Sequence, residues 1–94
     1  FKYNIAGIEI KLSHELSLLY EVTYVWKYSP AEKAGLQAGD LLLEINGNKS
    51  FMLNLYEMRG LFQKPSKIPM TLLVERNNEL LLLKVEMNDA LTIR

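Results

Sequence analysis

Residues 29–47, "SPAEKAGLQAGDLLLEING", constrain the fold more than any other stretch, because their turn residues fix where a short helix begins and ends. Ser29 is expected to cap a helix that starts at Pro30, since a serine hydroxyl accepts a first-turn N–H and proline lacks that donor. Glu32 follows Ser29 by three residues and predicts a capping box. Gly35 suits the left-handed residue that closes a helix. The sequence therefore predicts a short helix of about one and a half turns.

The second half of this stretch predicts a turn, a strand and a hairpin. Gly39 and Asp40 favour a tight turn, in which the Asp40 carboxylate is expected to cap backbone amides rather than perform acid–base chemistry. The apolar run at 41–45 reads as a strand. Asn46-Gly47 is a strong signal for a two-residue hairpin.

Two further strands precede the short helix. Residues 7–13, "GIEIKLS", alternate apolar and polar side chains and predict a half-buried strand. Residues 20–28, "YEVTYVWKY", place Tyr20, Val22, Tyr24, Trp26 and Tyr28 on one parity. Val25 interrupts this pattern and predicts a bulge or a strand end just before the helix.

A second helix is predicted at residues 54–62. Asn54 is its expected N-cap, and Glu57 stands at the third helical position. Its apolar stripe consists of Leu55, Met58, Leu61 and Phe62. Gly60 is expected to weaken this helix by roughly 1 kcal/mol relative to alanine.

The C-terminal part predicts a long hairpin whose arms, residues 70–76 and 79–87, flank Asn77-Asn78. In the second arm the residues on one face are Leu81, Leu83, Val85 and Met87. The expected fold class is α+β, mainly β: a small antiparallel β-sandwich or partial barrel of five to six strands with two helices. Ninety-four residues fit one domain, residues 1–94. The start at Phe1 rather than Met suggests a piece excised from a longer protein.

Composition and motifs exclude several classes of function. Eleven basic and eleven acidic residues leave no net charge to attract nucleic acid or an anionic membrane. Without cysteine the chain forms no disulfide or thiolate site, and it has no apolar run near the roughly 20 residues needed to cross a bilayer. His14, the lone histidine, reads as a solvated loop residue. No metal-ligand spacing, nucleophile constellation or cofactor motif is present, so we predict a non-catalytic chain without a cofactor or metal.

Residues 29–47 resemble the central signature of PDZ domains, S-P-A-x-x-A-G-L-x-x-G-D-x-Φ-x-x-Φ-N-G. The matching residues are Ser29, Pro30, Ala31, Ala34, Gly35, Leu36, Gly39, Asp40, Leu42, Ile45, Asn46 and Gly47. The expected element order also agrees with this family over nearly the whole chain. The start "AGIEI", the second helix and the final hairpin look most like the C-terminal PDZ domain of bacterial retropepsin-like aspartyl proteases.

The resemblance implies binding of an extended peptide, usually with a free C-terminus, as an added strand between a sheet edge and the longer helix. The implied edge strand runs from Ile8 to Leu12. The peptide-binding residues that the resemblance implies are Ile5, Ala6, Gly7, Ile8, Ile10, Leu12, Leu55, Arg59 and Phe62. Met58 takes the place of Arg59 if the helix register differs by one residue.

The turn at residues 5–8 corresponds to the Gly-Φ-Gly-Φ loop, whose amides bind the terminal carboxylate in this family. Ile5 replaces the first glycine and only Gly7 matches. Gly7 can also be read as a strand-entry turn without a ligand, and Leu55 and Phe62 as core residues.

The resemblance further implies an attached bacterial aspartyl protease, of which this chain is the non-catalytic part, in the cell envelope, periplasm or secreted space. The implied partners are a peptide or protein C-terminus and the protease domain. The alternative is a structural domain with a filled or vestigial groove, which serves dimerisation or interdomain packing. Its contact face is expected at Tyr24, Trp26 and Tyr28.

Overall fold

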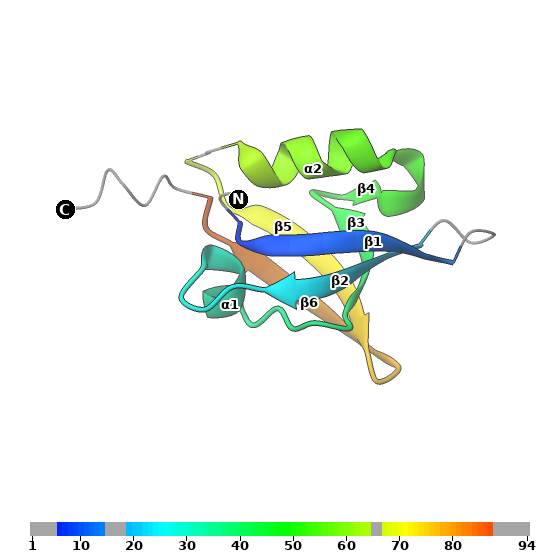
Figure 1. The fold of residues 1–94 in the computed structure, drawn as a ribbon, viewed down its shortest axis with the longest axis horizontal. Helices are drawn as coiled ribbons and strands as arrows, with labels where there is room; N and C mark the ends of the chain where they lie inside the picture. The colour runs from blue at the N-terminus through cyan, green and yellow to red at the C-terminus, as the bar shows by residue number, and fades with distance from the viewer. Residues whose placement is uncertain (1–5, 15–18, 65–66, 88–94) are drawn as a thin grey trace.

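The structure is a computed structural model that describes residues 6–14, 19–64 and 67–87 (Figure 1). The elements follow the order β1 (Ile8–His14), β2 (Leu19–Val25), α1 (Pro30–Ala34), β3 (Leu41–Ile45), β4 (Asn48–Lys49), a 3-10 turn η1 (Ser50–Met52), α2 (Leu55–Gln63), β5 (Met70–Arg76) and β6 (Glu79–Val85). The predicted order of strands and helices is confirmed. The η1 turn was not predicted.

The strands form one antiparallel sheet in the order β1-β2-β3-β5-β6, with β4 paired to β3. The sheet is open, so β1 and β6 lie at its two margins. The predicted class, mainly β with two helices, is confirmed. α2 lies along the β1 side of the sheet and α1 near β6, as Figure 1 shows.

The predicted ends of α1 are confirmed, but its capping box is wrong. The Ser29 hydroxyl accepts the N–H of Glu32 at 3.1 Å, and Gly35 closes the helix with a φ of 98°. The Glu32 carboxylate accepts the N–H of Tyr28 at 2.6 Å rather than that of Ser29. The Ser29 N–H is directed instead to the carbonyl of Trp26, at 3.3 Å. The Glu32 carboxylate therefore holds Tyr28, which has a left-handed φ of 66° and directly precedes the N-cap Ser29.

The capping box of α2 is present as predicted. The Asn54 side chain accepts the N–H of Glu57 at 2.8 Å, and the Glu57 carboxylate accepts the N–H of Asn54 at 3.0 Å. Met58 and Phe62 are buried beneath this helix. The complete box accounts for the sharp start of α2 at an exposed position.

A β-bulge shapes β2. The register between β1 and β2 shifts between Glu9 and Ile10, which leaves Thr23 as the extra residue. Beyond the bulge the alternation of side chains inverts, so Tyr24 is 50% exposed whereas Val25 packs against the core. The break in the pattern was predicted correctly, although the extra residue lies two positions earlier.

Both predicted hairpins have the expected backbone. Asn46 and Gly47 have φ values of 53° and 83°, and Asn77 and Asn78 have 53° and 67°. Left-handed residues of this kind give two-residue hairpins the twist of the flanking strands. The face of β6 also agrees with the pattern, because Leu80 is 64% exposed while its odd-numbered neighbours face the core.

Asp40 caps a backbone amide as predicted, and it also forms a partly buried ion pair that was not predicted. Its carboxylate accepts the N–H of Gln37 at 3.0 Å and two hydrogen bonds of 2.8 Å from the Arg76 guanidinium. Arg76 donates a further bond of 2.7 Å to the carbonyl of Gly35. The hydrogen bond to Asp40, helped by charge attraction and opposed by burial, raises the pKa of Arg76. This ion pair ties the end of α1 and the start of β3 to the end of β5.

Candidate functional site

The β1 margin is where the sequence places a binding site. β1 is the last strand on its side of the sheet and pairs with β2 alone among the described strands. α2 contacts β1 and runs beside it (Figure 1). An edge strand presents a row of main-chain donors and acceptors that another strand can pair with.

Four of the predicted site residues belong to the hydrophobic core. Ala6, Ile8, Ile10 and Phe62 are 1%, 1%, 7% and 1% exposed. Their side chains therefore pack in the core beneath the β1 margin. The sequence could not separate their core role from a ligand role, because both require apolar side chains at these positions.

The other predicted side chains lie nearer the surface. Leu12 is 39% exposed, Leu55 is partly buried and Arg59 is exposed. Met58 is fully buried in the core. Of the two alternatives that the helix register left open, Arg59 is the one that solvent, or a bound chain, can reach.

The turn before β1 is held by main-chain hydrogen bonds on both sides. Ala6 donates its N–H to the carbonyl of Phe62 at 3.1 Å, and its own carbonyl accepts the N–H of Ala31 at 3.0 Å. The Gly7 carbonyl accepts the N–H of Trp26 at 2.8 Å. Ile5 lies outside the described residues. The loop is thus tied to the end of α2, to α1 and to the segment after β2.

Gly7 cannot carry a side chain in this position. Its φ is 84°, and a Cβ built on it would lie 2.2 Å from the Cβ of Ser29. Real Cβ atoms do not approach other carbons so closely. The glycine therefore lets the start of β1 pass directly over the N-cap of α1.

The comparisons with known proteins agree with this geometry. The family model described as a PDZ domain matches residues 21–76, which is more than half of the chain. The chain belongs to the PDZ domain family. A comparison with curated proteins finds no match for this PDZ domain.

Solved structures similar to this PDZ domain come from several kinds of protein. A variant of the HtrA-type protease AlgW with a decapeptide is 22% identical, with a TM-score of 0.74 over 88% of this chain and 28% of the other. The HtrA3 PDZ domain bound to a phage-derived ligand is 22% identical, with a TM-score of 0.72 over 89% and 84%. The PDZ domain of EpsC from Vibrio cholerae is 23% identical, with a TM-score of 0.63 over 90% and 99%. These likenesses establish the fold.

The narrower resemblance to retropepsin-like aspartyl proteases is not supported. The similar structures include HtrA-type proteases, a photosystem II D1 C-terminal processing protease and EpsC. The domain spans 28% and 30% of two AlgW chains to which it is similar. These structures support the fold, and the PDZ family match supports a non-catalytic module.

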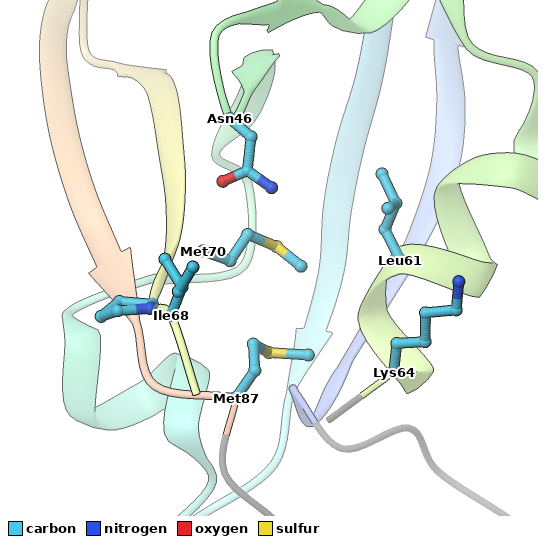
Figure 2. Close-up of a pocket in the computed structure, with 7 residues that line it drawn as sticks. Asn46, Leu61, Lys64, Ile68, Met70 and Met87 are labelled. Carbon is cyan, nitrogen blue, oxygen red and sulfur yellow. The ribbon is translucent and has the colours of Figure 1, made fainter. Parts of the chain in front are cut away.

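A hollow of about 360 Å³ lies on the other flank of α2 (Figure 2). It is lined by Asn46, Leu61, Lys64, Ile68, Pro69, Met70 and Met87. Leu61 and Arg59 are two residues apart on a helix and so face opposite flanks. The last turn of α2 thus separates this hollow from the β1 margin. No sequence pattern pointed to it, because its lining comes from four distant segments.

The aromatic residues after the bulge form a pair in which Tyr24 is exposed and Trp26 is half-buried. The rings of Tyr24 and Trp26 meet edge to face, with centroids 4.7 Å apart and planes at 83°. Tyr24 and Tyr28 are 50% and 81% exposed. The predicted contact face is therefore accessible in this PDZ domain.

His14 is the last residue of β1 and not a loop residue, because β1 extends further than the sequence indicated. Within the described ranges, no group of three or more histidine and acidic residues is arranged to hold a metal. No helix among those residues has the length and apolar character needed to cross a membrane.

Proposed function

We propose that this PDZ domain is a peptide-binding module that accepts an extended segment as a new strand beside β1. The observation that carries the proposal is the marginal position of β1 with α2 beside it. The exposed or half-exposed side chains of Leu12, Leu55 and Arg59 lie on these two elements. The similar structures of AlgW with a decapeptide and with a tripeptide, and of the HtrA3 PDZ domain with a phage-derived ligand, add support.

The expected affinity is modest. Three or four main-chain hydrogen bonds contribute about 1 kcal/mol each. One apolar side chain buried near Leu12 and Leu55 adds roughly 2 kcal/mol. These gains are opposed by the loss of freedom of a flexible peptide. We therefore expect dissociation constants of about 100 µM or weaker, which corresponds to about −5.5 kcal/mol at best.

The two sheet margins offer a matched test. Leu12 on β1 and Leu82 on β6 are 39% and 66% exposed, so each tolerates a polar side chain. In an NMR titration with extended peptides, we expect amide shifts along β1. Leu12→Lys should weaken binding about tenfold and Leu82→Lys should leave it unchanged. Equal effects of the two variants, or no shift in β1 at millimolar peptide, would contradict this assignment.

We further propose that the domain belongs to a bacterial protease of the cell envelope and regulates it or tethers its substrate. Support comes from the HtrA-type and D1-processing proteases among the similar structures. The aspartyl class has no such support. Sequencing the gene upstream of Phe1 tests the proposal. Paired Asp-Thr/Ser-Gly motifs would restore the aspartyl class, another protease signature would replace it, and a non-protease domain would contradict the proposal.

A second candidate function is interdomain or subunit packing. The Tyr24–Trp26 pair and the burial of Ile8 and Phe62 favour it, because a packed margin leaves the aromatic rings as the more accessible apolar surface. This alternative expects concentration-dependent assembly in sedimentation experiments that Tyr24→Ser abolishes. A monomer at all concentrations would exclude self-association.

A further inference from the structure

We infer that the β1 site takes internal extended segments rather than segments that end in a free carboxylate. The inference rests on the proposed function, since it specifies the ligand of the same site. It follows from the state of the loop that would have to hold the carboxylate, and from the charges around that loop.

The Ala6 N–H, the first described amide of the loop that would bind a carboxylate, already has an acceptor. The N–H of Ala6 donates to the carbonyl of Phe62, and both residues are 1% exposed. This carbonyl is among the last four of α2, which have no partner within the helix. Redirecting the Ala6 N–H to a ligand would leave a buried carbonyl without a hydrogen bond, which is unfavourable. The Ala6 amide is thus satisfied without a terminal carboxylate.

The dipole of α2 at this end of the site also opposes an anion. The C-terminal end of a helix carries partial negative charge, and the last turn of α2 has no basic residue to offset it. The next cation along the chain, Lys64, lines the hollow beside Leu61 on the opposite flank (Figure 2). A carboxylate near Ala6 would therefore face helix carbonyl groups. Of the two cations at 59 and 64, Lys64 lies on the far side of α2, and Arg59 lies on the β1 flank about one turn before Phe62.

Gly7 gives no independent support for carboxylate capture. Its glycine is required by the close approach of Ser29, and its carbonyl is bonded to Trp26. The residue type is therefore explained by the fold alone. An internal segment needs only the main chain of β1 and the apolar surface near Leu12 and Leu55, and it can continue past Ala6 without placing a charge there.

Three forms of one probe test this inference on the 94-residue chain. The probe is an N-acetylated decapeptide in which leucine and valine alternate with serine and threonine. It is made with a free C-terminal carboxylate, as the C-terminal amide, and with a Gly-Ser-Gly-Ser extension that makes the segment internal. Binding is followed by NMR, which also reports the Ala6 amide proton. We expect the free acid to bind at least threefold more weakly than the amide and the extended form, and hydrogen exchange at Ala6 to stay slow in each complex.

The outcomes separate the inference from the function on which it rests. Binding of the free acid as tight as, or tighter than, that of both other forms would overturn the inference and keep the peptide-binding function. A downfield shift of the Ala6 amide with the acid only would do the same. Absence of binding by all three forms at 1 mM would overturn the peptide-binding function itself. Tighter binding of the extended form would support the inference.

Discussion

The regions around α1 and α2 are held in different ways. The end of α1 is fixed by directional polar contacts: Gly35 closes the helix, and Arg76 bonds to the Gly35 carbonyl and to the buried Asp40. α2 is capped at its start, but at its end Lys64 has an extended backbone, with φ −92° and ψ 123°. Its packing depends on buried Met58 and Phe62 and on the bond from Ala6 to Phe62.

This difference indicates a division of roles within one small domain. Ion pairs with bidentate geometry hold a single arrangement, whereas apolar contacts permit small shifts at a lower cost. We interpret the α1 region as rigid and as the support of β1, and α2 as a helix that can shift when a strand binds beside it. Variants in the two regions test this difference.

Removing the Asp40 carboxylate should cost the most stability. Asp40→Ala leaves the Arg76 guanidinium and the Gln37 amide without their partner, and breaking a buried pair typically costs about 3–5 kcal/mol. Because the Arg76 side chain is 25% exposed, we expect the lower end, about 3 kcal/mol, in urea denaturation. The pKa of Arg76 is raised, so its charge persists at any pH below the ordinary range of arginine.

The matched control is the other ion pair. Lys49 and Glu44 are 3.1 Å apart, with side chains 60% and 28% exposed. Glu44→Ala should cost less than about 1 kcal/mol. Similar losses for Asp40→Ala and Glu44→Ala would show that the α1 region is not specially rigid.

A methyl group on Gly7 should be nearly as damaging. Gly7→Ala forces alanine into a left-handed backbone and places its Cβ 2.2 Å from that of Ser29, and both changes destabilise the fold. We expect a loss of about 3 kcal/mol, which combines roughly 1 kcal/mol of backbone strain with the cost of overpacking. Thermal unfolding of Gly7→Ala and of the wild type measures this loss of stability.

Gly47 supplies the control for backbone strain alone. Its φ is 83°, almost that of Gly7, but nothing lies within 4 Å of the Cβ position. Gly47→Ala should therefore cost only about 1 kcal/mol. Equal losses for Gly7→Ala and Gly47→Ala would mean that β1 moves away from Ser29 easily, and the close approach would lose its importance.

Local signals in the sequence predicted most of the fold. Helix caps, glycine and asparagine turns, and alternation act over two to five residues, so the bounds of α1, the Asn46 and Asn77 hairpins and the inward face of β6 were read correctly. The errors lie where two local signals compete. The Ser29 N–H had two possible acceptors, and the bulge at Thr23 depends on the partner strand β1.

The candidate site could be predicted only in part. The chain order places β1 and α2 together by resemblance, and the exposure of Arg59 rather than Met58 follows from helix geometry once the register is known. The hydrogen bond from Ala6 to Phe62 joins main-chain atoms far apart in sequence, so no residue type in the sequence indicates it. The Asp40–Arg76 pair is equally distant and was missed for the same reason.

The start of α2 should contribute a smaller, local effect. Asn54→Ala removes the side-chain acceptor of the Glu57 N–H and breaks the capping box, which should cost about 1 kcal/mol. Asn54→Ser keeps an acceptor and should remain within a few tenths of a kcal/mol of wild type. Circular dichroism during urea denaturation distinguishes them. If Ala and Ser behave alike, packing rather than capping fixes the start of α2.

Gly60 should give the smallest effect, with the opposite sign. It lies in the interior of α2 with no left-handed φ, and nothing lies within 4 Å of its Cβ position. Gly60→Ala should therefore stabilise the domain by about 0.5–1 kcal/mol, because alanine loses less backbone entropy in a helix. Gly47→Ala, with the same empty surroundings and a left-handed φ, should destabilise it. A loss of stability in Gly60→Ala would mean that α2 is already held against other atoms at this position, and that it is as fixed as the α1 region.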